Sequence, residues 1–369
     1  MGCTRLTYNN ALAHIKDGKF HKKTMFWLRN RFVNECNVNP AQKFLIDTPK
    51  HVREGACQDL AAAYKSNFQR MKTKPGHKFD MHFRRKKDVQ SMAIPKASMR
   101  IVGSGIVIYP KMLSKDPIKT TSDKPLLAIK QDCRLSMDTL GRWILSIPTQ
   151  VDTFTVADNQ GERVCSIDPG IRTFATTWSP QGESYKIGHM DSSRMMRHLI
   201  QIDTLTSSIS KASGKRKRRM QAALDKMRTR HANIMRDFHY QIANFLVKRY
   251  DTIVLPNFDS KSMASKLTRR LTTKTVRSMM GLGHGLFRQR LSDVAARRDT
   301  KVDMCTEEYT SKTCSRCGEL HHTLGGAKKF TCKACGLQID RDLQGAFNIY
   351  IKRLREFPGA LPPATALER

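Results

Sequence analysis

The chain has 369 residues, and its 66 lysines and arginines outnumber its 32 aspartates and glutamates, which gives a formal net charge of +34. Such a charge predicts a polyanionic partner, and nucleic acid fits best because binding to phosphates releases condensed counterions. The sequence contains no run of 18 apolar residues and no hydrophobic leader, so we expect neither a membrane span nor a secretion signal.

Residues 10–90 are predicted to be mainly helical. Val52, Ala56, Leu60 and Ala63 recur at the spacing of one helical face. Thr48-Pro49 stands in front of them and is typical of a helix start. The pattern predicts a helix that begins near residue 50.

Two features of this first region could contact nucleic acid. Trp27 could stack on a base, although a helical tryptophan between Met25 and Leu28 is more often a core residue. The region ends in a basic stretch that is a candidate phosphate contact and contains Arg84, Arg85, Lys86 and Lys87.

From about residue 91 to 155 the pattern changes to short strands. Met99–Tyr109, Leu126–Lys130 and Trp143–Ile147 are β-branched runs separated by polar turns, which predicts a small β-barrel or sheet module. Gly103-Ser104-Gly105 is expected to bend one of these strands. Asp158–Gly161 follows as a predicted domain boundary.

The second half has an informative order of elements. Strands are predicted at Val164–Asp168, Thr173–Trp178, Tyr185–Ile187, Thr252–Leu255 and Lys301–Thr306, and helical regions at about 191–250, 261–298 and 342–355. The order β-β-β-α-β-α-β, followed by an insertion and a last helix, is that of a ribonuclease H-like fold. The proline- and alanine-rich tail, 357–369, is expected to be unpacked.

A second basic cluster lies inside the long helical region and consists of Lys215, Arg216, Lys217, Arg218 and Arg219. Three interpretations stay open. The cluster could clamp the phosphates of a nucleic acid, serve as a nuclear-import signal, or form a solvated helix tip. An import signal would place the protein in the nucleus of a eukaryotic host.

Two aspartates stand where a two-metal nuclease needs carboxylates from separate elements. Asp168 ends the first of the five strands, directly before Pro169-Gly170. Asp342 opens the last helix, where Asp340 competes with it. Each aspartate also has a purely structural interpretation, the first as a turn-initiating residue and the second as a partner of the helix dipole.

A third carboxylate is expected near the end of the fourth strand, where the sequence reads Leu255-Pro256-Asn257 and contains no glutamate. Asp259 lies beyond the strand. Glu307 and Glu308, at the exit of the fifth strand, are the other candidates. Strands four and five lie near the same edge of the acid cluster in such folds, so either strand can supply the carboxylate.

Four cysteines form two tight pairs, Cys314-x2-Cys317 and Cys332-x2-Cys335, with 14 residues between them. Two such pairs can surround one tetrahedral Zn²⁺ and leave no open position, which predicts a structural zinc site. Gly318 and Gly336 follow the second cysteine of each pair, where such knuckles need a permissive backbone. The alternative is free or disulfide-linked cysteines.

These motifs resemble the transposon-encoded TnpB nucleases and, among their eukaryotic and viral relatives, the Fanzor family. EEYTSKTCSRC (Glu307–Cys317), Cys332–Gly336 and DRDLQGAFN (Asp340–Asn348) are similar to the zinc-finger and third RuvC motif, and SIDPGIRTFAT is similar to the first RuvC motif. TPKHVREGACQDLAAAYKSNF and FDMHFRRKKDVQSMAIP resemble TnpB-type N-terminal regions, so the resemblance spans roughly residues 48–353.

The resemblance implies an α+β multidomain protein. Its parts would be a helical recognition region (1–90), a β-barrel wedge domain (91–157), a ribonuclease H-like RuvC nuclease domain (158–309 and 340–356) with an inserted zinc ribbon (310–339), and a disordered tail (357–369). The implied function is that of an RNA-guided endonuclease that cuts double-stranded DNA beside a short flanking motif. Its implied partner is a guide RNA of the omega-RNA type, and we expect the protein to act as a monomer.

Carried onto matching positions, the resemblance makes Asp168 and Asp342 the first and last catalytic acids that hold two Mg²⁺ ions, and the four cysteines the ligands of one Zn²⁺. Two positions depart from the family pattern. The usual second-motif glutamate aligns with Pro256, which cannot bind metal, and Gln344-Gly345-Ala346 replaces the usual Asn-Ala-Ala.

Fanzor proteins and some TnpB relatives resemble each other in having this glutamate at a position just before the zinc finger, in the motif Glu-x-Tyr/Phe-Thr-Ser-Lys-Thr-Cys. This motif favours Glu307 over Glu308 as the third acid and magnesium ligand. Two other functions stay open: an RNA-guided DNA-binding protein that does not cut, which Pro256 motivates, and a guide-independent RuvC-like nuclease.

Overall fold

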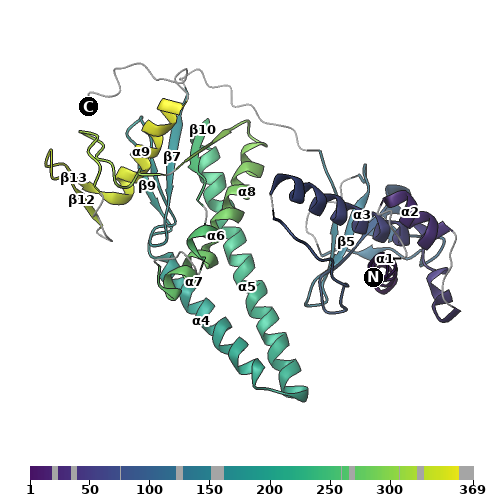
Figure 1. Ribbon diagram of the computed structural model, residues 1–369. Helices are drawn as coiled ribbons and strands as arrows, with labels where there is room; N and C mark the ends of the chain where they lie inside the picture. The colour runs from purple at the N-terminus through teal and green to yellow at the C-terminus, as the bar shows by residue number, and fades with distance from the viewer. Residues whose placement is uncertain are drawn as a thin grey trace. The chain divides into compact units, whose positions relative to one another are not determined.

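The structure, a computed structural model, describes residues 1–18, 24–34, 40–74, 76–121, 128–150, 162–258, 260–265, 271–306, 308–321 and 328–356. The chain divides into two compact units, Met1–Gln150 and Val151–Arg369, each with its own hydrophobic core (Figure 1). None of the helices in these described segments is both long and apolar enough to cross a bilayer.

The first unit begins with helices. They are α1 (Gly2–Lys16), α2 (Met25–Arg29) with the π-helical turn η1 (Asn30–Asn34), the 3-10 segment η2 (Pro40–Leu45) and α3 (Lys50–Thr73). As Thr48-Pro49 predicts, α3 begins directly after Pro49, and Val52, Ala56 and Leu60 on its predicted face are buried. The prediction of helix up to residue 90 is wrong beyond Thr73, because Phe79 and Met81 pack into the α1–α3 core from non-helical chain.

The structure contradicts the core interpretation of Trp27. Helix α2 is little more than one turn long, so only one of its side chains can face the core. That residue is Leu28, which is fully buried, whereas Trp27 is 42% exposed and Phe26 is 65% exposed.

Two three-stranded antiparallel sheets complete the first unit. The strands are β1 (Gln90–Ile94), β2 (Met99–Val102), β3 (Gly105–Ile108), β4 (Ile118–Lys119), β5 (Cys133–Met137) and β6 (Trp143–Ser146), in the orders β1-β5-β6 and β2-β3-β4. Met99–Tyr109 is therefore a hairpin and not one bent strand, because Gly103 has a φ of 57° and Val102 pairs with Gly105. Residues 126 and 127 of the predicted strand Leu126–Lys130 lie outside the described segments, and 128–130 form no strand.

A five-stranded mixed sheet forms the centre of the second unit. Its strands are β7 (Val164–Pro169), β8 (Ala175–Trp178), β9 (Ser184–Ile187), β10 (Thr252–Pro256) and β11 (Lys301–Cys305). The order is β11-β10-β7-β8-β9, with β10 parallel to β7 and β11 and the β7-β8-β9 meander antiparallel. All five strands predicted from the sequence are present, in the predicted chain order.

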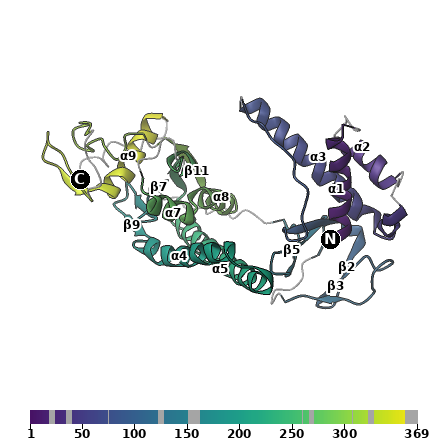
Figure 2. The same cartoon turned by 60° about the horizontal axis from the view of Figure 1, so that its bottom comes forward.

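Helices cover both faces of this sheet. They are α4 (Asp191–Ser210), α5 (Gly214–Val247), α6 (Ser260–Met263), α7 (Thr273–Leu282), α8 (His284–Ala295) and α9 (Arg341–Glu356). Ile167 and Leu255 pack with α5 and α8 on one face, whereas Val164 and Val254 pack with α9 on the other (Figures 1 and 2). The two-residue period of a strand therefore places Asp168, which has the parity of Val164, on the α9 face.

A buried ion pair ties α9 to the edge strand β11. Arg353 is 2% exposed, and its Nε and one terminal nitrogen each lie 2.9 Å from Asp303 Oδ2. Lys301 Nζ approaches the same carboxylate at 3.2 Å, but its side chain is 66% exposed. One carboxylate thus has a buried partner and an exposed partner.

We predict that Arg353→Leu lowers the free energy of unfolding by about 3 kcal/mol, because it leaves the Asp303 carboxylate buried without its main partner. The matched control, Lys301→Ala, removes the exposed partner and should cost at most about 1 kcal/mol. Urea unfolding followed by circular dichroism measures both values. Equal losses in the two variants would contradict the assignment of Arg353 as the main partner.

Candidate active site and metal centre

Asp168 lies where β7 meets α9. Ser166 lies two residues before Asp168, on the same face of β7, and is fully buried. Its hydroxyl donates to the backbone oxygen of Ala346 at 2.7 Å. This bond joins residues 180 positions apart in the chain. This hydrogen bond fixes the point along α9 at which the end of β7 packs.

The carboxylate of Asp168 lies directly against the backbone of α9 at Gly345. A Cβ atom at position 345 would stand 2.5 Å from Asp168 Oδ2 and 3.0 Å from Asp168 Cγ, closer than real contacts allow. Gly345 is one helical turn after Asp342, and the two residues lie on neighbouring faces of the helix. The structure thus brings the first and last predicted acids to the same turn of α9.

Asp340 and Asp342 have different tasks at the start of α9. Asp340 Oδ1 accepts from the backbone N–H groups of Asp342 and Leu343, and Asp340 Oδ2 lies 2.6 Å from Lys186 Nζ. Burial alone would raise the pKa of Asp340, but these hydrogen bonds hold that pKa below its ordinary value. Asp340 therefore caps the helix, and Asp342 is half-buried in the first turn, where the helix-dipole interpretation also applies to it.

The predicted third acid cannot be placed. Glu307 and Asp259 lie outside the described residues. Glu308 is described and exposed, and its backbone oxygen accepts from Lys352 of α9 at 3.5 Å. Pro256 is buried at the end of β10, in register with Cys305 of β11.

Two side-chain amides of α9 hold the turn that follows β11. Asn348 Nδ2 donates to the backbone oxygens of Thr310 and Thr313, and Gln344 Nε2 donates to the oxygen of Thr313, each at 2.7 Å. Both amides are buried, Gln344 completely. We call this pair the amide clamp. Sequence reasoning missed it because nothing in the chain order signals that residues 310–313 lie beside this helix.

The Pro169-Gly170 turn after Asp168 is supported from the opposite side by a neutral histidine. His284 Nε2 donates to the oxygen of Gly170 at 3.0 Å, and its ring stacks on Phe174 with centroids 4.6 Å apart. Burial lowers the pKa of His284 to about 4, despite this hydrogen bond. The ring is therefore uncharged near neutral pH, and the turn has a fixed donor.

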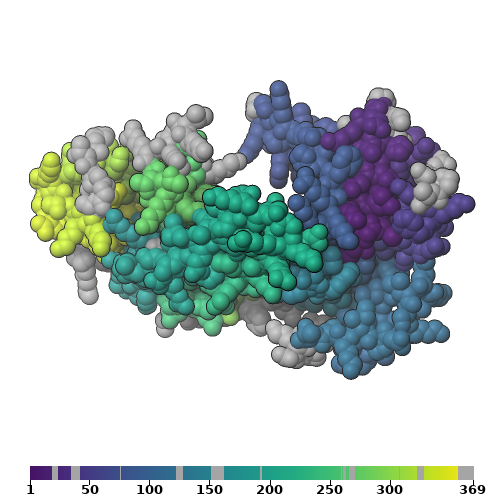
Figure 3. Space-filling view, turned by 90° about the horizontal axis from the view of Figure 1, so that it is seen from below, coloured from purple at the N-terminus to yellow at the C-terminus, as the bar shows by residue number. Residues whose placement is uncertain are grey.

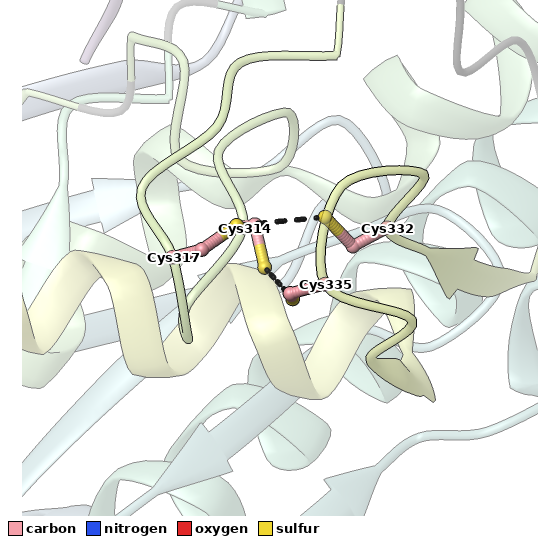
Figure 4. A group of neighbouring side chains, drawn as sticks. All are labelled: Cys314, Cys317, Cys332 and Cys335. Carbon is pink, nitrogen blue, oxygen red and sulfur yellow. Dashed lines mark hydrogen bonds between the residues drawn. The ribbon is translucent and has the colours of Figure 1, made fainter.

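The four cysteines converge as the spacing predicts (Figure 4). Their sulfur atoms all lie within 4.8 Å of one another, and the pairs Cys314–Cys335 and Cys317–Cys332 are 3.6 Å apart. A tetrahedral zinc site with Zn–S bonds of 2.3 Å needs S···S distances of about 3.8 Å, so the cluster could hold one zinc ion.

The backbone around the cluster also fits. Gly318 and Gly336 have φ values of 76° and 71°, which confirms that both positions need a residue without a side chain. Strands β12 (Lys329–Thr331) and β13 (Gln338–Asp340) form the hairpin that carries the second pair. His321 Nε2 lies 3.3 Å from Cys332 Sγ, a contact that the sequence did not indicate.

The basic residues singled out in the sequence differ in their surroundings. Residues 215–219 are all exposed at the start of α5, whose first turn contains no acidic residue, and the α4–α5 pair forms a large part of the surface in Figure 3. Arg85, Lys86 and Lys87 are exposed as well. Arg84 is already engaged, since it pairs with Asp59 at 3.1 Å and lies over the ring of Tyr8.

Comparison with known proteins gives relatives along nearly the whole chain. Residues 284–349 match the family described as "Cas12f1-like, TNB domain". The chain is 27% identical over 368 residues to "Putative transposase A625R" of Paramecium bursaria Chlorella virus 1, covering 96% of this chain and 83% of that protein.

Two further relatives extend this comparison. "TnpB-like protein L770" of Acanthamoeba polyphaga mimivirus is 31% identical over 248 residues, which are 66% of this chain but only 45% of that protein. "Putative RNA-guided DNA endonuclease InsQ" of Escherichia coli (strain K12) is 24% identical over 375 residues, covering 94% of this chain and 86% of that protein.

The fold has a counterpart among solved structures. A cryo-EM structure of the Cas12f1-sgRNA-target DNA complex superposes with a TM-score of 0.52 at 13% sequence identity, over 94% of this chain and 80% of that chain. The likeness shows a shared α+β architecture.

We predict that the purified chain contains about one zinc ion, and that Cys335→Ser removes most of it, because three thiolates hold the ion less tightly than four. Elemental analysis after gel filtration measures the zinc content. Cys3→Ser is the control, since Cys3 lies far from the cluster in sequence and outside the four-sulfur group. An unchanged zinc content in Cys335→Ser would contradict the site.

We predict that Gly345→Ala does not give the gain in stability of about 0.5–1 kcal/mol that alanine normally brings to a helix interior, because the added methyl group must displace the Asp168 carboxylate. The matched control is Gly285→Ala in helix α8, where an added Cβ meets nothing within 4 Å, and which should leave stability unchanged or slightly higher. Chemical denaturation measures both. Similar values for the two variants would show that Asp168 does not rest on this turn of α9.

Proposed function

Starting from a chain that is related to the TnpB-like transposases and shares the fold of Cas12f1, we propose that this protein is an RNA-guided DNA endonuclease of the Fanzor type. The observation that carries the proposal is the position of Asp168 on α9. Its carboxylate rests on Gly345, one turn from Asp342, although 174 residues separate the two aspartates in the sequence (342 minus 168). Convergence of this kind is what a two-metal phosphodiesterase requires.

The acids have separate supports in the proposed site. The β7 strand and the Ser166 bond to α9 hold Asp168, and Asp340 caps the helix and accepts from the backbone N–H of Asp342, which fixes the backbone there. Two Mg²⁺ ions would activate a water molecule for in-line attack on phosphorus and steady the leaving 3′ oxygen. The residues of the chain supply the fixed carboxylate oxygens for this chemistry, and the neutral His284 keeps the turn beside Asp168 in place.

We assign the third carboxylate to Glu307. The assignment rests on the sequence motif Glu-x-Tyr-Thr-Ser-Lys-Thr-Cys, in which Glu307 and not Glu308 occupies the glutamate position. The amide clamp adds support, because it anchors the chain just beyond this position to the helix that carries Asp342. Pro256 cannot fill the role from β10.

The zinc ion is proposed to be structural. Four thiolates leave no open coordination position, so the ion has no direct part in phosphate chemistry. In the chain, its four cysteines lie between Thr313, which the amide clamp holds, and the start of α9, which carries Asp342. Zinc would therefore stabilise the path from β11 to Asp342.

We propose that guide RNA and double-stranded DNA are the polyanionic partners. A relative that aligns with 94% of this chain has RNA-guided DNA endonuclease in its name, and a net charge of +34 needs a partner of opposite sign. The exposed cluster at the start of α5 lies at the positive end of a helix dipole, which makes it a phosphate site. The helices and the two small sheets of the first unit are assigned to guide and flanking-motif recognition.

The test is cleavage of a plasmid by the full chain, expressed with its native flanking locus so that bound RNA can be sequenced. We predict that Mg²⁺ and the copurified RNA support cutting, and that Asp168→Asn and Asp342→Asn each slow it on the order of a hundredfold or more, because each removes a metal ligand. Glu307→Gln should act likewise, whereas its neighbour Glu308→Gln should cut at close to the rate of the unchanged protein.

Each outcome points to one function. RNA-dependent DNA binding without cutting under any divalent metal would favour a regulatory binding protein. This alternative is motivated by Pro256, which stands where a metal-binding glutamate is usual. Cutting without a defined bound RNA would favour a guide-independent nuclease. A large loss in Glu308→Gln and none in Glu307→Gln would reverse the assignment of the third acid.

A further inference from the structure

Tyr309 has a backbone conformation that is costly for a residue with a bulky side chain. Its φ is 65°, in the left-handed region, where such a residue costs on the order of 1–3 kcal/mol. The side chain does not repay that cost by burial, because Tyr309 is 60% exposed. No aromatic ring in the described part of the chain stacks on it. The fold therefore maintains a strained backbone that presents an aromatic ring to solvent.

Hydrogen bonds to one carbonyl fix this conformation. The backbone oxygen of Tyr309 accepts from the backbone N–H groups of Lys312 and Thr313 at 3.0 Å and from the hydroxyl of Thr313 at 2.9 Å. The amide clamp then holds Thr310 and Thr313 on α9. Since Thr310 is buried and α9 is packed on the sheet, the direction of the chain at Tyr309 is set by the core of the second unit.

The ring is attached beside the proposed active site. Asp168 rests on Gly345 of α9, and Asn348, one helical turn further on, holds the residue that follows Tyr309. In the chain, Tyr309 comes directly after Glu308 and two residues after Glu307. Two successive turns of α9 therefore locate the first acid and the base of the tyrosine.

An exposed ring at this place has a chemical use that the acids lack. Carboxylates hold metal ions and repel bare phosphate, and the basic clusters bind the backbone without contacting bases. In the proposed function, guide pairing opens the duplex and delivers a single strand to the acids, and the bases of a single strand can stack on an aromatic face whatever their identity. Resting on the function proposed above, we propose that Tyr309 is a substrate-contacting residue that stacks on a base of the DNA strand next to the scissile phosphate.

A double-mutant cycle that combines Tyr309 variants with single abasic positions in the DNA tests this proposal. The full chain with its bound RNA is titrated with target DNA in which one nucleotide at a time near the cut is abasic, with Ca²⁺ in place of Mg²⁺ so that the DNA stays intact. Tyr309→Gly removes the ring and relieves the left-handed backbone, so its melting temperature should be equal or higher. Tyr309→Phe keeps the ring and is the matched control.

We expect one or two abasic positions to weaken binding about tenfold in the unchanged protein and in Tyr309→Phe. Tyr309→Gly should bind intact DNA about as weakly, with no further loss at those positions, because the ring and the base form one interaction. Tight binding of intact DNA by Tyr309→Gly, or the same abasic penalty in all three proteins, would overturn the proposal. The binding cycle does not require cleavage. A protein that fails to cut under any metal would therefore contradict the proposed nuclease function, while the binding measurement would still test stacking by Tyr309 independently.

Discussion

The packing of α9 against β7 is the contact on which the proposed site depends. Ser166 bonds to the helix backbone at Ala346, and Asp168 rests on the next residue back, Gly345. On the flank of the same helix, the amide clamp holds the turn that leaves β11. Three segments that are far apart in the sequence thus share one rigid reference. A helix suits this task because its backbone hydrogen bonds are satisfied internally and its side chains leave in fixed directions.

Electrostatic repulsion among basic residues is a second constraint, and it destabilises the chain when no polyanion is bound. Five adjacent cations at the start of α5 lie at the positive end of the helix dipole, and the first turn of that helix has no acid to offset them. A fold tolerates such a cluster where water and salt screen the repulsion among its charges. Binding of a polyanion relieves this repulsion, which adds to the affinity for that polyanion. Arg84 differs in kind, because Asp59 and the ring of Tyr8 already use its charge. Sequence alone does not separate an arginine of that kind from its neighbours in the same basic run.

Whether a strand could be predicted from the sequence depends on which of its two faces are buried. The strands β7 and β10 are covered by helices on both sides, so they read as apolar runs and were found. In the first unit β1, β4 and β5 were missed, because their polar residues interrupt any apolar run. The cysteines could be named because their spacing marks them, whereas Asp168 and Asp342 were candidates by their positions at the end of a strand and the start of a helix. Gly345 and the amide clamp act across long sequence separations, for which a single sequence has no signal.

On the proposed assignment, the two departures from the TnpB pattern both lie around the proposed active site. An acid at the end of β10 would be positioned by the sheet itself, whereas an acid beyond β11 is attached to a turn and needs another support. Gln344, in place of the usual asparagine, belongs to the clamp that supplies this support through Thr313. Gly345, in place of the usual alanine, gives the Asp168 carboxylate room to lie against the helix. Gln344 thus holds the turn at Thr313 and Gly345 contacts Asp168, so a change at either residue of the Gln-Gly pair would act on the proposed site without altering one of its acids.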